Sequence, residues 1–257
     1  MKILIIGDIV GCCGTDFLKK ELGGIIKSYG IDMVIANGEN AAKNNGLDAS
    51  TADSLFASGV DVITSGNHIW NKFEMQNVID DYVNILRPAN YPGDCPGNGY
   101  VIYNAGGTKV LVISVLGTVY LESLTSPFET VERILNRENG SYDISIVDIH
   151  AEATSEKAAF ARYFDGKLSA VVGTHTHVQT ADERILPQGT AFITDLGMTG
   201  AYESILGVEC ERVIKKFITK MPTRFEQAVG ECQFNAVVVT VDNNFKAISI
   251  ERVFIVK

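Results

Sequence analysis

The sequence predicts a protein of the α/β class, and two features of the chain support this. Short runs of β-branched and aliphatic residues alternate with helical patterns of roughly ten residues, which is typical of a sheet whose strands are joined by helices. Polar residues that could bind a ligand follow several of the apolar runs. With 257 residues, 46% of them hydrophobic, the chain can bury a substantial core, and we expect residues 1–257 to form a single domain.

Strands and helices alternate regularly in the first part of the chain. The apolar run at 3–6 predicts a buried strand that stops at the turn-forming pair Gly7-Asp8. The elements expected after it are a helix over 16–27, a strand over 33–36, a helix over 48–58 and a strand over 60–63. The segment 87–99 is rich in Pro, Gly and Asn and predicts an extended loop.

The second part of the chain continues this pattern and then loses its helices. Strands are expected over 110–115, 143–149, 169–172 and 191–194, and helices over 128–137 and 154–164. Fewer helical patterns follow. The runs 234–241 and 247–256 predict a hairpin across 242–245, where Asp and two Asn residues favour a turn.

The composition limits the classes of ligand that the protein could bind and the cellular compartment in which we expect it. A net charge of −9 and an isoelectric point of about 5.0 oppose an extended nucleic-acid footprint, but not a small phosphorylated substrate. No apolar stretch approaches the ~20 residues that span a bilayer, and the short N-terminal run lacks the features of a signal peptide. Five cysteines without disulfide or zinc spacing indicate a reduced, cytoplasmic protein. Cys12 and Cys13 are expected to be small buried residues.

Candidate metal ligands follow the predicted strands. All four histidines lie just past apolar runs, at positions 68, 150, 175 and 177, and Asp8, Glu39 and Asn67 occupy comparable places. Because ligands bind at the carboxyl ends of parallel strands, we expect these side chains to meet at one edge. Two carboxylates in an apolar setting repel each other unless a cation lies between them. The mixed nitrogen and oxygen set favours Mn²⁺, Fe or Zn²⁺, and its size suits two metals that share a bridging carboxylate.

The order of these segments resembles that of the calcineurin-like metallophosphoesterase superfamily. The segments are Gly7-Asp8, Asn37-Gly38-Glu39-Asn40, Gly66-Asn67-His68, His150 and Gly173-Thr174-His175-Thr176-His177. Longer strings, over 37–42, 87–92, 149–157 and 194–200, are similar to the YmdB-type subfamily of cyclic-nucleotide phosphodiesterases. The resemblance covers roughly residues 1–200, with the motifs in family order.

The resemblance implies a fold, a site and a reaction. The fold would be a two-sheet β-sandwich flanked by helices. The implied ligand sets are Asp8, Glu39, Asn40 and His177 for one metal, and Glu39, Asn67, His150 and His175 for the other. Glu39 would bridge two ions, with Fe or Mn favoured and Zn possible. A metal-bridging hydroxide would attack a small phosphodiester, with a 2′,3′-cyclic nucleotide favoured, and His68 would serve as general acid or phosphate donor.

This chain departs from the superfamily pattern at three places. Val10 stands where the superfamily has a histidine ligand, and Asn40 would fill that vacancy. Glu39 replaces the usual bridging aspartate. Ile69 follows His68 where an acid often orients the histidine, so what fixes His68 is open. Thr15 also stands near the place of a subfamily arginine.

Several of these residues have simpler explanations. Asp8 could cap a helix or belong to a glycine-rich phosphate turn, and His150 alone could be a structural histidine. Glu152 could orient a histidine or merely begin a helix. Arg87 and Tyr91 are candidate substrate contacts, yet with their following prolines they could equally stiffen the loop.

Two further functions stay open from the sequence. One is a phosphomonoesterase or nuclease that uses the same metals. The other is a metal-binding regulatory protein with weak catalysis. A homo-oligomer is also possible, and no membrane partner is expected.

Overall fold

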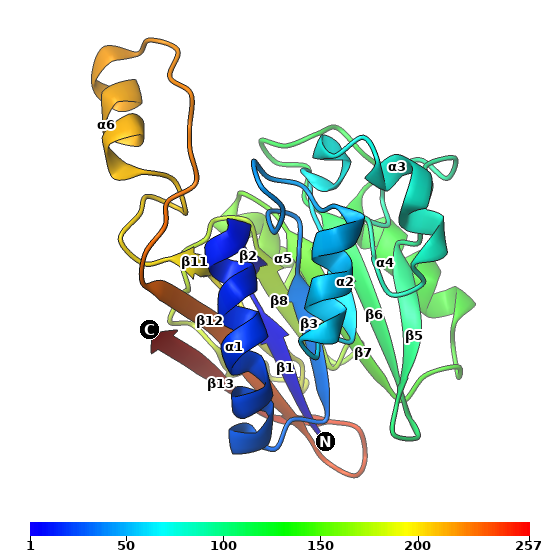
Figure 1. The fold of residues 1–257 in the computed structure, drawn as a ribbon. Helices are drawn as coiled ribbons and strands as arrows, with labels where there is room; N and C mark the ends of the chain where they lie inside the picture. The colour runs from blue at the N-terminus through cyan, green and yellow to red at the C-terminus, as the bar shows by residue number, and fades with distance from the viewer.

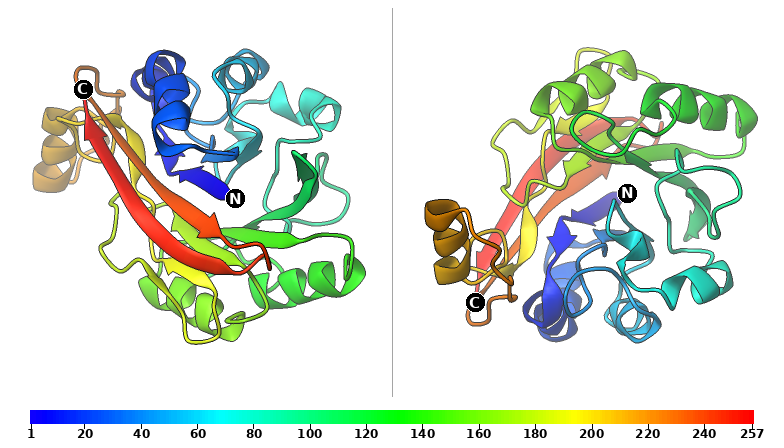
Figure 2. Two further views of the ribbon diagram at one scale, coloured as in Figure 1. Left: turned by 90° about the horizontal axis from the view of Figure 1, so that it is seen from below. Right: turned by 90° about the horizontal axis from the view of Figure 1, so that it is seen from above.

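The computed structural model describes all 257 residues, and its core is two β-sheets that pack face to face. Helices cover the outer face of each sheet, so the protein has four layers, as the views along the sheets show (Figure 2). The predicted two-sheet sandwich flanked by helices is confirmed.

The secondary structure alternates along the first part of the chain, as predicted. The strands are β1 (Lys2–Ile6), β2 (Asp8–Ile9), β3 (Met33–Asn37), β4 (Val62–Thr64), β5 (Tyr100–Ala105), β6 (Thr108–Leu116), β7 (Ile144–His150), β8 (Ala170–Thr174), β9 (Arg184–Ile185), β10 (Ala191–Ile193), β11 (Met198–Ala201), β12 (Cys232–Val241) and β13 (Ala247–Val256). The α-helices are α1 (Gly11–Tyr29), α2 (Ala49–Ala57), α3 (Met75–Val78), α4 (Pro127–Arg137), α5 (Thr154–Tyr163) and α6 (Cys210–Thr219).

Each sheet contains a run of neighbouring parallel strands, although β12 runs antiparallel to its neighbours in the first sheet. The first sheet has the order β2-β11-β12-β1-β3-β4, with β13 paired to β12, and the second has the order β5-β6-β7-β8-β10-β9. The strands β1, β3 and β4 are parallel to one another, as are β6, β7, β8 and β10. Two sets of carboxyl strand ends are therefore available to build a site.

Three apolar layers hold the sheets and helices together. Because side chains alternate along a strand, β1 contributes to two of them. Leu4 and Ile6 pack in the layer that includes α1 and α2, whereas Ile3 and Ile5 face the second sheet. The third layer lies between the second sheet and the helices α4 and α5.

The expected elements and the observed ones differ at several places. Helix α1 begins at Gly11, earlier than the expected residue 16, and the β12–β13 hairpin is confirmed. The strands β2, β5, β9 and β11 and the helices α3 and α6 were not expected from the sequence. Strand β5 is a partly exposed edge strand without a regular apolar alternation, and α6 stands away from the two sheets (Figure 1).

The expectation that Cys12 and Cys13 are buried is wrong. The early start of α1 places Cys12 on the solvent side of the helix and leaves Cys13 only partly covered. All five cysteines are free thiols. None of the helices is both long enough and apolar enough to cross a lipid bilayer.

Two glycines of helix α1 test how closely this helix packs on the first sheet. A Cβ at Gly14 would overlap the backbone carbonyl of Thr199 and press on Ile9, whereas a Cβ at Gly23 would meet nothing within 4 Å. We expect Gly14→Ala to lower the free energy of unfolding by about 1–3 kcal/mol, through overpacking. Gly23→Ala should raise it by about 0.5–1 kcal/mol, because alanine favours a helix interior. Urea unfolding measures both; equal stability of the two variants would contradict the close approach of α1 to β11.

Candidate metal centre

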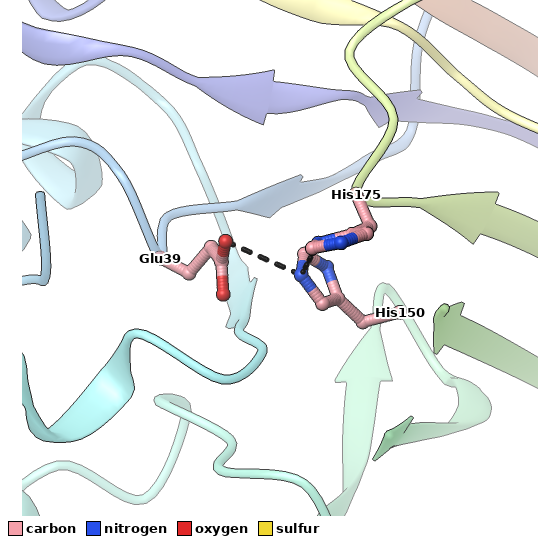
Figure 3. A group of neighbouring side chains, drawn as sticks. All are labelled: Glu39, His150 and His175. Carbon is pink, nitrogen blue, oxygen red and sulfur yellow. Dashed lines mark hydrogen bonds and ion pairs between the residues drawn. The ribbon is translucent and has the colours of Figure 1, made fainter. Parts of the chain in front are cut away.

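Strand ends from both sheets bring the predicted ligands together. Glu39 lies two residues after β3, and Asn67 three residues after β4, in the first sheet. In the second sheet, His150 is the last residue of β7 and His175 directly follows β8. Figure 3 shows Glu39 facing the imidazoles of His150 and His175, and ligand atoms of these three residues lie within 4.8 Å of one another.

The two candidate carboxylates are both fully buried, and one has an unsatisfied oxygen. Oδ2 of Asp8 accepts a hydrogen bond from the backbone N–H of His175 at 3.1 Å, whereas Oδ1 has no hydrogen-bond partner. This oxygen lies 3.7 Å from Nε2 of His177 and 3.8 Å from Nδ1 of His150. A buried acceptor without a partner is destabilised unless a cation or a donor approaches it. The donor set around Asp8 therefore fits a metal ion.

Burial and mutual charge shift the pKa values of the cluster. Burial raises the pKa of Asp8 to about 6, and the charge of Glu39 adds to this rise. Burial alone would raise the pKa of Glu39, but the adjacent His150 lowers it well below its usual value. Burial would lower the pKa of His150, but the carboxylates of Glu39 and Asp8 raise it to about 9. Burial and His150 lower the pKa of His175 to about 4. The buried carboxylates thus stabilise positive charge on His150, and a divalent cation would interact with the same carboxylates.

Asn40 lies beside the position that lacks the superfamily histidine. Val10, which stands at that position, pairs with Asn40 as in a parallel strand. The side-chain nitrogen of Asn40 lies 2.9 Å from Oε1 of Glu39 and 3.3 Å from Nε2 of His177. Nδ1 of His177 lies 3.1 Å from the carbonyl of Leu206, which can only accept, so Nε2 is the nitrogen that is free to bind a ligand.

His68 has two orienting partners that the sequence did not reveal. Its Nδ1 lies 2.8 Å from Oδ1 of Asn40 and 3.2 Å from Oε1 of Glu39. Because both oxygens accept, Nδ1 carries a proton, and Nε2 makes no hydrogen bond within the protein. The side chain is 32% exposed and lines the cavity beside the cluster. Asn40 and Glu39 thus do what an acid at Ile69 would do.

Two consecutive buried hydrogen bonds orient the ring of His150. Nδ1 of His150 lies 2.9 Å from the hydroxyl of Thr174, and that hydroxyl donates to Oδ1 of Asp148 at 2.7 Å. The hydroxyl proton is therefore directed to Asp148, and the oxygen accepts from Nδ1. Nε2 is left to face Oδ1 of Asn67 at 3.2 Å and Oε1 of Glu39 at 3.2 Å. Such partners fix the ring orientation of ligand histidines.

A buried ion pair supports the loop that carries His175 and His177. Nζ of Lys157 lies 2.6 Å from Oδ2 of Asp195, and both side chains are fully buried. The same oxygen accepts from the backbone N–H and the hydroxyl of Thr176, at 3.1 and 2.7 Å. His175 and His177 have φ angles of 101° and 65°, a conformation that costs of order 1–3 kcal/mol when a residue other than glycine adopts it. Asp195 therefore anchors a strained turn at its middle residue.

A cavity of about 300 Å³ opens beside these residues. Its lining includes Glu39, Asn40, His68, Glu152, His175, His177, Leu206, Val208 and Gln227. This volume lies at the lower end of the range for small-molecule sites. A compact ligand could therefore enter the cavity and reach the buried carboxylates.

The remaining candidates lie in different surroundings. Oε2 of Glu152 lies 3.1 Å from Nε2 of His175, which fits an orienting role. Arg87 is buried and donates to the carbonyls of Pro88, Cys95 and Pro96, so its contacts are those of a residue that stiffens a loop.

Tyr91 packs edge-on against Trp70, with ring centroids 6.2 Å apart. Neither Arg87 nor Tyr91 lines the cavity beside Glu39.

Position 66 shows why a glycine precedes Asn67 and His68. A Cβ at Gly66 would overlap the ring of His150 and the carboxylate of Glu39. No signal in the sequence pointed to three of the supporting residues. Thr174 and Asp148 orient His150, and Lys157 pairs with Asp195. Their roles depend on contacts between segments that are far apart in the chain.

Four layers with carboxylates, amides and imidazoles at the strand ends define a protein of the metallophosphoesterase type. The family model for YmdB-like proteins matches residues 4–253, and the chain belongs to this family.

Known relatives agree with this assignment. The chain is 46% identical, over 99% of its length and 97% of the relative, to a 2′,3′-cyclic-nucleotide 2′-phosphodiesterase of Bacillus subtilis. A solved structure of a hypothetical protein from Thermus thermophilus superposes with a TM-score of 0.94, at 39% identity over the whole of both chains. A solved structure described as a novel phosphatase, from Mycoplasma pneumoniae, superposes with a TM-score of 0.93, at 34% identity over all of this chain and 93% of the other.

Removing Asp195 should release the histidine loop and leave the Lys157 charge buried without a partner. We expect Asp195→Ala to lower the free energy of unfolding by about 3–5 kcal/mol, as for other broken buried pairs. The control is Glu132→Ala, which removes an exposed partner 3.4 Å from Lys167 and should cost less than about 1 kcal/mol. Chemical denaturation compares them. Similar losses for both variants would argue against the anchoring role of Asp195.

Proposed function

We propose that this protein is a metal-dependent phosphodiesterase that hydrolyses small phosphodiesters, with 2′,3′-cyclic nucleotides favoured. One observation carries the proposal. The buried carboxylates of Asp8 and Glu39 face three imidazoles, in a chain that is 46% identical to a 2′,3′-cyclic-nucleotide 2′-phosphodiesterase over nearly the whole of both proteins.

The cluster would hold two metal ions, with Fe or Mn favoured and Zn possible. The proposed sets are Asp8, Glu39, Asn40 and His177 for one ion, and Glu39, Asn67, His150 and His175 for the other. Glu39 would be the shared ligand, because its carboxylate contacts both Asn40 and His150. Asn40 joins the set only with its amide reversed, since its oxygen now faces His68.

The ions, when bound, would lower the pKa of a coordinated water and offset the charge of the phosphate. The chain supplies the remaining steps. Hydrolysis of a cyclic phosphate adds water, breaks one ester P–O bond and leaves a phosphomonoester. His68 gives a proton to the departing ribose oxygen from Nε2, while Oε1 of Glu39, 3.2 Å from its Nδ1, holds the ring. The five-membered ring is strained, so a cavity of about 300 Å³ with few substrate contacts is sufficient.

A phosphomonoesterase is the second candidate. It is favoured by the similarity to the Mycoplasma pneumoniae protein described as a phosphatase, at 34% identity. Both activities would use the same ions, so rates on matched substrates must separate them.

We also propose that residues 1–257 form one domain that works in the cytoplasm on a small phosphodiester. The apolar layer shared by the two sheets supports a single domain, and the five free thiols fit a reducing compartment. Arg87 and Tyr91 were candidates for contacts with the substrate. Neither residue lines the cavity beside Glu39, and this position favours a structural role for both.

Replacing His68 should separate catalysis from metal binding. We expect His68→Ala to keep its metal content and to lose about 10²–10⁴-fold in turnover, the usual effect of a lost acid or base. Asp8→Ala is the comparison variant and should lose metal, because it removes a buried carboxylate of the cluster. Elemental analysis and steady-state kinetics measure the two effects. An unchanged rate for His68→Ala would remove it from the mechanism, and unchanged metal in Asp8→Ala would refute the ligand scheme.

The substrate preference can be tested with protein loaded with Mn²⁺ or Fe. We expect 2′,3′-cyclic AMP to be hydrolysed faster than an aryl phosphomonoester or single-stranded RNA, because the cavity admits a compact, strained diester. A chelator should abolish the activity, and the metal should restore it. Hydrolysis of a chromogenic aryl phosphodiester with intact cyclic nucleotides would overturn the preference, and a faster phosphomonoester would favour the second candidate.

A further inference from the structure

A second cavity, of about 440 Å³, adjoins the one at the metal centre, and we call it the side cavity. The two cavities share His177 and Leu206, and Nδ1 of His177 lies 3.1 Å from the carbonyl of Leu206. The other walls of the side cavity come from the loop after β8, from β11 and the loop that follows it, and from β12 and β13, which are neighbours in the first sheet (Figure 1). A ligand that extends across His177 and Leu206 would occupy both cavities.

Asn235 of β12 lines the side cavity with a buried acceptor that has no partner. The residue is only 3% exposed, and its Oδ1 makes no hydrogen bond within the protein. Such an acceptor is destabilising unless a donor approaches it. A Cβ at Gly197 would lie 2.7 Å from Nδ2 of Asn235, so a glycine at this position leaves room for the amide. The side cavity thus offers a hydrogen-bond acceptor to a ligand that carries N–H groups.

A second amide in the lining, that of Gln179, has both of its donors occupied. Its Nε2 donates to the carbonyls of Leu196 and Ala236, at 3.2 and 3.0 Å. Because an amide nitrogen has only two N–H groups, the oxygen of Gln179 is the atom left to interact with a ligand. The free acceptors of Gln179 and Asn235 both favour a ligand that donates from N–H groups.

An exposed aromatic ring lies beside Asn235. Phe254 of β13 is directly opposite Asn235 in the pairing of β12 with β13, so the two side chains are neighbours on one face of the sheet. The ring of Phe254 is 57% exposed and lines the side cavity, as does the ring of Tyr202, which is 43% exposed. Exposed rings are the surfaces on which nucleic-acid bases stack.

The side cavity has little charge of its own. Arg252 is the one residue of its lining with a permanent charge, and Nε of Arg252 lies 2.8 Å from Oε2 of Glu183. No aspartate or glutamate lines the side cavity, in contrast to the buried carboxylates beside the first cavity. The lining therefore suits an uncharged, flat group that donates hydrogen bonds. A nucleobase has these three properties.

We propose that the side cavity is the subsite for the base of a nucleotide substrate. An N–H group of the base donates to Oδ1 of Asn235, and the plane of the base stacks on Phe254. The ribose passes over Leu206 and His177, which places its cyclic phosphate in the cavity beside Glu39. This inference rests on the proposed function for the identity of the phosphodiester, and it adds the residues that recognise the base.

Binding to the metal-free protein tests the subsite without catalysis. Saturation-transfer NMR with adenosine should show the largest transfer at the base protons, and this transfer should be lost in Phe254→Ala and in Asn235→Leu. The matched control is Ile248→Ala, because Ile248 lies in the same strand and is 59% exposed but does not line the side cavity. Asn235→Leu should melt no lower than the wild type, because leucine has a similar volume and removes a buried acceptor without a partner. Thermal melting verifies that all three variants are folded.

Kinetics of the metal-loaded protein supply the second test. Phe254→Ala should lower kcat/KM for 2′,3′-cyclic AMP, relative to kcat/KM for ethylene phosphate, on the order of 10-fold, and mainly through KM. Ethylene phosphate is the comparison because it is a five-membered cyclic diester without a base. Ile248→Ala should leave this ratio unchanged.

The outcomes separate the subsite from the proposed function. An unchanged ratio in Phe254→Ala, or base protons that receive the same saturation in the wild type and in both cavity variants, would overturn the subsite. The absence of transfer to the base protons in the wild type would overturn it as well. A wild type that hydrolyses no cyclic nucleotide, but binds adenosine through Asn235 and Phe254, would refute the proposed function and support the subsite.

Discussion

The burial of two carboxylates in one cluster is the constraint on which the rest of the site depends. Asp8 and Glu39 are both excluded from solvent, and a buried charge is tolerated only when opposite charge and hydrogen bonds surround it. The surrounding imidazoles and the raised pKa of His150 follow from that requirement, whereas the unsatisfied oxygen of Asp8 shows that the protein alone does not meet it in full. A cation bound in the cluster would offset the charge of these carboxylates and would give the free oxygen of Asp8 a partner.

The scaffold holds these groups in place through a second set of buried polar contacts. Thr174 and Asp148 fix the ring of His150, and the pair Lys157–Asp195 fixes the turn between His175 and His177. Each contact joins segments far apart in the chain. A ligand set spread over two sheets can keep its geometry only if the sheets themselves pack rigidly, which the apolar layer between them ensures.

The cavity joins this buried cluster to the surface, and the loop that follows β11 forms part of its wall through Leu206 and Val208. Leu206 is exposed on one side and binds His177 through its carbonyl on the other. The position without the superfamily histidine is closed by Val10, whose pairing with Asn40 brings an amide to the cluster instead.

The sequence alone determined the class of fold and the set of candidate ligands. Apolar periodicity is local, so β1, β3 and β7 could be predicted from the sequence. The polar residues at the ends of these strands indicated the edge of the sheets where the candidate ligands lie. The tertiary structure decided what depends on distant contacts. It turned the oxygen of Asn40 to His68, paired Lys157 with Asp195 and removed Arg87 from the cavity lining. It also placed α6 outside the two sheets, because the pattern of a helix does not say which part of the chain it packs against.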